Sequence, residues 1–165
     1  MSSTRMCRLL MSSVCVLAIE ACVDPEASGP PALHGGVDVC ADCGMSILAP
    51  NFAAAALIER EGRREHAVFD DVGCMLLWKK QATGVRILEE WSGTMEGNGW
   101  VRVNDGYFVV GSDVQTPMDF HIVCCASSSA ADAVVRSRGG SRVPYASVQP
   151  VIAPSQSNQA TPNSP

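Results

Sequence analysis

The residues best suited to chemistry are Cys40, Cys43 and Met45, which stand with Gly44 in the pattern Cys-x-x-Cys-Gly-Met. Thiolate and thioether sulfur atoms are soft donors, and together they select Cu(I) over Zn(II), Mg(II) or Ca(II). Because Cys43 and Met45 are two residues apart, an extended backbone places both on one side, and Gly44 lets the chain fold round an ion. We therefore predict Cu(I) ligands at Cys43 and Met45. Three roles stay open for Cys40: a further ligand, a redox partner of Cys43, or only a neighbour of it.

A Cys-x-x-Cys pair also fits a structural zinc site or a thiol redox centre. Structural zinc normally takes four Cys or His ligands, and the sequence holds no second Cys-x-x-Cys pair. Cys124 and Cys125 are adjacent, so along a strand they point to opposite faces. A thiol-disulfide oxidoreductase that uses Cys40 and Cys43 stays open as the alternative. We expect a binding protein rather than an enzyme, because the sequence has no Gly-rich phosphate loop, nucleophile elbow or Ser-His-Asp arrangement.

The remaining candidate side chains have structural explanations. Cys74 falls on the apolar face of an expected helix, where a cysteine usually acts as a small buried hydrophobe. His66 and His121 fall on expected strands and are interpreted as structural rather than as ligands. Asp70 and Asp71 are adjacent carboxylates at the start of the same helix, where such residues usually cap the backbone.

The N-terminal residues predict export and a lipid anchor. Residues 1–21 read as a signal peptide, with two arginines ahead of an apolar stretch that is too short to span a bilayer. Ile19, Ala21 and Cys22 resemble the lipobox of bacterial lipoproteins, in which the cysteine is acylated and several acyl chains hold the protein on a membrane. Because Val23 follows instead of the aspartate that retains lipoproteins at the inner membrane, we expect the periplasmic face of the outer membrane.

Composition divides the rest of the chain. Residues 22–37 are rich in Pro, Gly, Ala and Ser and predict a tether, residues 38–145 predict the folded body, and residues 146–165 predict a disordered tail. The formal net charge is −5 and no basic run is present, which argues against nucleic acid as a partner. With Cys22 acylated, five thiols remain after the signal, and an odd number cannot pair completely within one chain.

The folded body predicts an α+β fold. Turn chemistry at residues 60–63 separates two apolar or extended runs and indicates a hairpin, although alanine prefers helix and leaves the first run ambiguous by propensity alone. Asp70 or Asp71, and later Ser127 or Ser128, can cap helices. The elements expected in chain order are strands at 52–59 and 65–69, a helix to Gln81 ended by Gly84, strands at 85–91, 101–103, 107–110 and 121–124, and a helix to Arg138 ended by Gly139 and Gly140.

The two halves of the body predict an internal repeat. His66 and His121 are 55 residues apart and each begins a similar His-apolar-Val run, and Gly84 and Gly139 have the same separation. Between these markers lie a strand end, a capped helix and a glycine stop in the same order. We therefore predict two small ββαβ units, over about residues 45–92 and 99–145.

With these motifs in view, the sequence resembles the NosL family, the accessory lipoproteins of nitrous oxide reductase. The strongest likeness is the Cys-x-x-Cys-Gly-Met motif together with the run Phe-Asp-Asp-Val-Gly-Cys-Met-Leu at residues 69–76. Weaker matches are Trp100 with Val101, Pro117 with Met118, and the closing Gly139 and Gly140. The resemblance covers about residues 38–145.

The resemblance implies a periplasmic Cu(I) metallochaperone that supplies the copper-sulfur centre of nitrous oxide reductase during denitrification. Carried over residue by residue, it implies Cu(I) ligands at Cys43 and Met45 and a third ligand, Met118, from the second repeat. Copper bound there would tie the repeats together. In this sequence Asp119 follows Met118, where the family usually has glycine.

Overall fold

The computed structural model describes residues 27–97 and 99–150. The predicted signal peptide, Cys22 and residues 151–165 of the predicted tail lie outside the described residues. The predicted domain boundaries stay predictions. Within the described part of the chain, no helix is both long enough and apolar enough to cross a membrane.

The first unit is a hairpin, a helix and a third strand. Its elements are β1 (Ala54–Arg60), β2 (Arg63–Phe69), α1 (Val72–Gln81) and β3 (Arg86–Gly93). Glu61 and Gly62 join β1 to β2 with φ of 52° and 78°, the pair of left-handed residues that a tight two-residue hairpin turn requires. Asp71 caps α1 and the helix runs to Gln81, both as predicted, but the C-cap is Ala82 and not Gly84.

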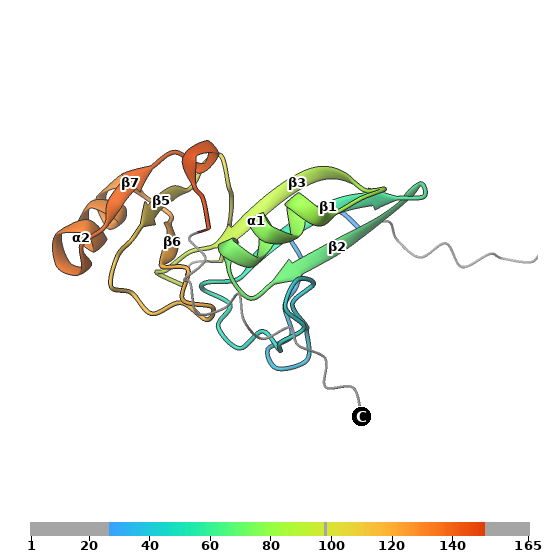
Figure 1. Ribbon diagram of the computed structural model, residues 1–165, viewed down its shortest axis with the longest axis horizontal. Coiled ribbons are helices and arrows are strands. Elements are labelled where there is room, and N and C mark those ends of the chain that lie inside the picture. The colour runs from blue at the N-terminus through green and yellow to red at the C-terminus, as the bar shows by residue number, and fades with distance from the viewer. Residues whose placement is uncertain (1–26, 98, 151–165) are drawn as a thin grey trace, which may run out of the picture.

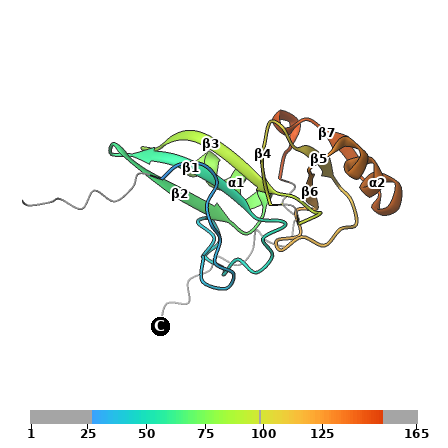
Figure 2. The ribbon, with the colours of Figure 1, turned by 180° about the vertical axis from the view of Figure 1, so that it is seen from behind.

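The alanine-rich run is a strand because of where it lies. β1 is bordered by β2 on one side and by β3 on the other, and Ala54, Ala55 and Ala56 are fully buried. In Figure 1, α1 covers one face of this sheet, and Figure 2 shows the N-terminal described segment on the other face. Burial on both faces favours small apolar side chains, so tertiary packing overrides the helix propensity of alanine.

The second unit repeats this order. It consists of β5 (Tyr107–Val110), β6 (Ile122–Cys125), α2 (Ser128–Arg138) and β7 (Ser141–Val143). Its sheet has the order β6-β5-β7, which corresponds to β2-β1-β3 of the first unit, and all pairs in both sheets are antiparallel. Ser127 caps α2 and Gly139 ends it with φ of 70°. The predicted α+β fold of two ββαβ units is thus confirmed.

The connection between the units crosses from one sheet to the other. β4 (Trp100–Arg102) pairs with β3 and extends the first sheet, so the turn at residues 104–106 leads into the second sheet instead of closing a hairpin. The units share a core, in which Phe69, Val72 and Met75 pack in one cluster with Phe108 and Phe120. After β7, the short 3-10 helix η1 (Tyr145–Ser147) returns to the first unit through a hydrogen bond from the Tyr145 hydroxyl to Glu90, 2.7 Å.

The N-terminal described segment is held against the first sheet. Trp100 Nε1 donates a hydrogen bond to the carbonyl of Pro31, 2.9 Å, and His66 Nε2 lies 2.7 Å from the carbonyl of Gly29. Both carbonyls belong to the predicted tether. The chain therefore approaches the Cys-x-x-Cys motif along the face of the sheet opposite α1 (Figure 2).

Candidate metal centre

The Cys-x-x-Cys-Gly-Met motif forms the tip of a small hairpin. Val39 and Ser46 form an isolated antiparallel bridge, and within it the Cys40 N–H donates to the Met45 carbonyl at 2.8 Å, while the Gly44 N–H donates to the Cys40 carbonyl at 3.0 Å. Gly44 has φ of 76°, a conformation that glycine adopts without steric cost. The motif therefore bends back on itself through Gly44 instead of running extended.

This hairpin is docked at the junction between β2 and α1. The Ala41 N–H donates to the carbonyl of Val68 in β2, 2.8 Å, and Ile47 at the base of the hairpin is fully buried. Directly after β2, Asp71 accepts a hydrogen bond from the Cys74 N–H, 3.0 Å, and so begins α1. Cys74 thereby lies in the first helical turn, beside the hairpin tip.

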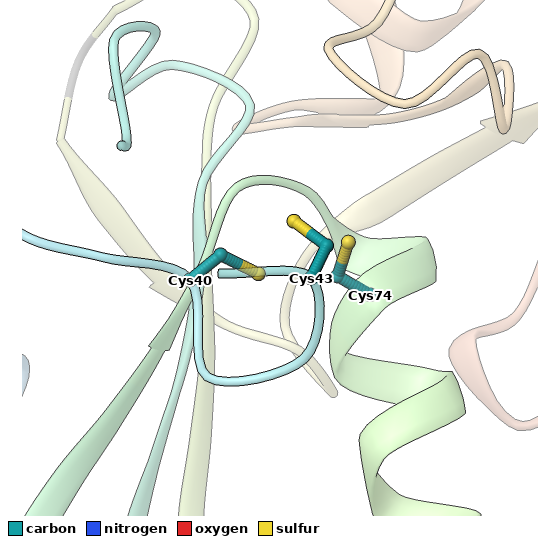
Figure 3. Close-up of side chains that lie close together, drawn as sticks. All are labelled: Cys40, Cys43 and Cys74. Atoms are coloured by element: carbon teal, nitrogen blue, oxygen red, sulfur yellow. The ribbon is translucent and has the colours of Figure 1, made fainter. Parts of the chain in front are cut away.

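Three thiols meet at this junction. The sulfur atoms of Cys40, Cys43 and Cys74 all lie within 4.8 Å of one another, and Figure 3 shows Cys43 and Cys74 side by side with the Cys40 side chain extending toward them. Among the described residues, this is the one group of three or more Cys, His, Asp or Glu residues close enough to share an ion. Cys40 and Cys74 are 2% and 1% exposed, whereas Cys43 is half-buried.

Cys74 is the member that the sequence interpretation passed over. Its predicted burial is correct, but its side chain also faces two other thiols. The available signal was its position in the first turn of a capped helix, where backbone N–H groups generally favour a thiolate, although here the hydrogen bond to Cys40 raises the pKa of Cys74. Spacing along the chain could not reveal that Cys74 lies beside Cys40 and Cys43. Thirty residues separate Cys43 from Cys74, and they include the whole hairpin β1–β2.

The environment of the cluster stabilises one thiolate. The Cys40 sulfur accepts a hydrogen bond from the Cys74 thiol and backbone N–H bonds from Cys43, Asp70 and Asp42, and these donors lower the pKa of Cys40 despite its burial. The same sulfur-to-sulfur hydrogen bond raises the pKa of Cys74. Burial raises the pKa of Cys43. A thiolate is the form that binds metal, and the Cys74 thiol and the hairpin backbone bring Cys40 closer to that form.

Asp71 connects the cluster to the second unit. It is 1% exposed, and while one carboxylate oxygen caps Cys74, the other accepts the N–H of Met118 at 3.2 Å. Burial raises the pKa of Asp71 to about 6. Met118 is partly buried against the core that contains Cys40 and Cys74. Asp119 follows with φ of 55°, the left-handed conformation that glycine adopts most easily. The backbone at this position therefore has the conformation expected of a glycine, although the residue is aspartate.

The other predicted site residues lie in different surroundings. Met45 is 54% exposed at the hairpin tip, and the roles of Met45 and Met118 as ligands stay predictions. His121 precedes β6 with φ of 55°, not on the strand as expected, and its Nδ1 lies 3.0 Å from the carbonyl of Val114. Cys124 and Cys125 are buried in β6, outside the thiol cluster.

Comparisons with known proteins identify the family of this chain. The NosL family profile matches residues 32–153. Among solved structures, the chain resembles the crystal structure of the copper chaperone NosL from Shewanella denitrificans, with a TM-score of 0.58 and 18% identity over 73% of this chain and 98% of that chain. A search of curated protein sequences finds no significant match. The family profile covers most of the chain and includes the Cys-x-x-Cys-Gly-Met hairpin, the Cys74 turn and the Met118 loop, so this protein belongs to the NosL family.

Proposed function

We propose that this protein is an exported Cu(I) metallochaperone that binds the ion through Cys43, Met45 and Met118, with Cys40 as a further ligand. The observation that carries the proposal is the group of sulfur atoms at the hairpin tip, where three thiols lie within 4.8 Å of one another beside an exposed Met45. Soft sulfur donors without imidazole or carboxylate ligands favour Cu(I). The name of the similar solved protein, a copper chaperone, supports the same assignment.

The partial solvent exposure of Cys43 and Met45 supports transfer of the copper ion to another protein rather than its permanent storage. Cys43 is half-buried and Met45 is 54% exposed, so a ligand from a recipient protein can approach the ion before the old ligands leave. Met118 comes from the second unit and its backbone is hydrogen-bonded to Asp71 at the start of α1. Copper bound by Met118 and Cys43 would therefore join the two units.

The recipient and the location complete the proposal. We propose that the protein delivers copper to nitrous oxide reductase or a related exported cuproprotein, and that acylated Cys22 anchors it at the periplasmic face of a membrane, the outer one by preference. Family membership supports the recipient, and the lipobox-like residues before Cys22 support the anchor. Recovery of the mature N-terminal peptide with acyl groups on Cys22, by mass spectrometry, tests the anchor. Failure of a copper-loaded chain to activate copper-free nitrous oxide reductase would exclude this recipient.

The competing function is a thiol-disulfide oxidoreductase that uses Cys40 and Cys43. Such an enzyme needs an accessible thiol with a lowered pKa as its nucleophile. Here the two properties are divided, because Cys40 has the lowered pKa but is 2% exposed, while burial raises the pKa of the more accessible Cys43. This division favours metal binding. Turnover of a dithiol substrate without metal would restore the enzymatic alternative.

The direct test uses the full-length chain with Cys7, Cys15 and Cys22 replaced by serine, called here the three-serine protein. We expect it to bind Cu(I) under anaerobic conditions and to retain it against a Cu(I) chelator such as bathocuproine disulfonate. The double variant Cys43→Ser with Met45→Leu should lose this retention.

The matched control is the double variant Cys125→Ala with Met95→Leu. It changes a buried cysteine and a partly buried methionine in the second hydrophobic cluster, which lies apart from the thiols. This control variant should retain copper as well as the three-serine protein does. If the Cys43 and Met45 double variant binds Cu(I) as tightly as its parent, these residues do not form the site. Preferential retention of Zn(II) by the parent would also contradict the proposal.

A further inference from the structure

We propose that the copper site has two neighbouring positions that share Cys43: an inner position formed with Cys40 and Cys74, and an outer position formed with Met45 and Met118. This inference rests on the proposed function and extends it. The inner position would retain the ion out of contact with solvent, and the outer position would present it to the recipient. Cys43 would stay bound while the ion moves between them.

The inner position already has nearly the right dimensions. A metal–thiolate bond is about 2.3 Å long, so three sulfur atoms in a plane round one ion lie about 4 Å apart. The three sulfur atoms of the cluster lie within 4.8 Å of one another. Each pair therefore needs to close by less than about 1 Å, which side-chain rotation supplies without moving the hairpin or the helix.

Burial separates the two positions. Cys40 and Cys74 are 2% and 1% exposed, and Met45 is 54% exposed. An ion held by both buried thiols is out of reach of a recipient, while an ion at Met45 is at the surface. Cys43, half-buried on the hairpin tip, lies between these extremes, and Figure 3 places its sulfur beside that of Cys74. It is thus the ligand that both positions can use.

The charges of the ligands give each position its role. Three thiolates surround Cu(I) with negative charge and hold it tightly, and the burial of Cys40 and Cys74 limits competition from water. One thiolate and two thioethers form a neutral complex with Cu(I), which a recipient thiolate attacks more easily. Moving outward, the ion breaks its bonds to Cys40 and Cys74 and forms bonds to Met45 and Met118. Copper stays Cu(I) and no electron is transferred. The released Cys74 sulfur takes up a proton from solvent, and the Cys40 sulfur stays a thiolate that accepts the Cys74 hydrogen bond.

The test compares four single substitutions in the three-serine protein: Cys74→Ala, Cys40→Ala, Cys43→Ser and Met45→Leu. Cys125→Ala is the matched buried-cysteine control. Cys74→Ala should lower Cu(I) affinity by at least about tenfold, because even residues that only support metal ligands change affinity by that factor. Met45→Leu should lower the equilibrium affinity less than Cys74→Ala does, and it should slow the transfer of copper to a recipient protein. X-ray absorption of the unsubstituted copper-loaded protein should show three sulfur atoms at the short thiolate distance of about 2.3 Å.

The outcomes distinguish this inference from the proposed function. If Cys74→Ala and Cys40→Ala have no effect on affinity while Met45→Leu lowers it, copper has only the outer position, and the two-position inference is wrong although the chaperone assignment stands. An absorption spectrum that places only one sulfur atom at the short distance would overturn it in the same way, even if Cys74→Ala fails to fold. If Cys43→Ser also leaves the affinity unchanged, both the inference and the proposed function fail.

Discussion

The close contact between Gly73 and Phe120 allows a test of the Gly73→Ala substitution. Helix propensity and core packing have opposite effects on the stability of this variant. Gly73 lies in the first turn of α1, between the cap Asp71 and Cys74. A Cβ atom at Gly73 would lie 2.1 Å and 2.2 Å from Cδ2 and Cγ of the Phe120 ring. Phe120 is buried and these ring atoms are close to its backbone, so the ring cannot turn away without displacing the loop that carries Met118.

Propensity alone predicts that Gly73→Ala stabilises the helix by up to about 1 kcal/mol. Overpacking a well-filled core costs about 1–3 kcal/mol. Since the contact is more than 1 Å below the ordinary range of 3.4–4 Å, the steric cost should prevail, and the free energy of unfolding should fall by about 1–2 kcal/mol. Copper retention should fall as well, because the displaced loop carries Met118 and the substituted turn carries Cys74.

Anaerobic urea unfolding of the three-serine protein, followed by tryptophan fluorescence, measures the change. The control is Gly35→Ala, where no heavy atom lies within 4 Å of the added Cβ; it should change stability very little. The double variant with Phe120→Leu should cost less than the sum of its single substitutions, because the smaller side chain makes room for the Cβ. A Gly73→Ala protein more stable than its parent would refute the reasoning.

Two further predictions concern residues outside the metal centre. Burial raises the pKa of Cys124 to about 12 and that of Cys125 to about 11; because the thiolate is the reactive form, iodoacetamide should label both far more slowly than free cysteine at neutral pH, and faster as pH rises. Mass spectrometry of the labelled peptides measures this, and rapid labelling of the folded protein would contradict it. Tyr145→Phe removes the hydrogen bond to Glu90 and should lower the free energy of unfolding by about 1–2 kcal/mol, an effect that urea unfolding detects; an unchanged midpoint would show that this contact does not join the two units.

The elements that the sequence predicted correctly are those whose signals are local. The turn at residues 60–63, the Asp71 cap and the Ser127 cap each depend on residues a few positions apart, and all three are present. The strand nature of β1 was ambiguous because propensity favours helix for alanine, and burial between two strands decided it. Strands at 101–103 and 107–110 were predicted, but the sequence could not show that the turn between them connects two different sheets.

The residues of the metal centre also differ in how far the sequence alone could place them. The sequence by itself limited the separation of Cys40 and Cys43 to the reach of two intervening residues, and it left the role of Cys40 open. Only the tertiary structure decided that Cys74 joins them and that Asp71 holds the Met118 backbone beside the same helix turn. Bonded geometry limits neighbours along the chain to a few ångströms, whereas the approach of distant segments depends on strand pairing, helix capping and core packing acting together.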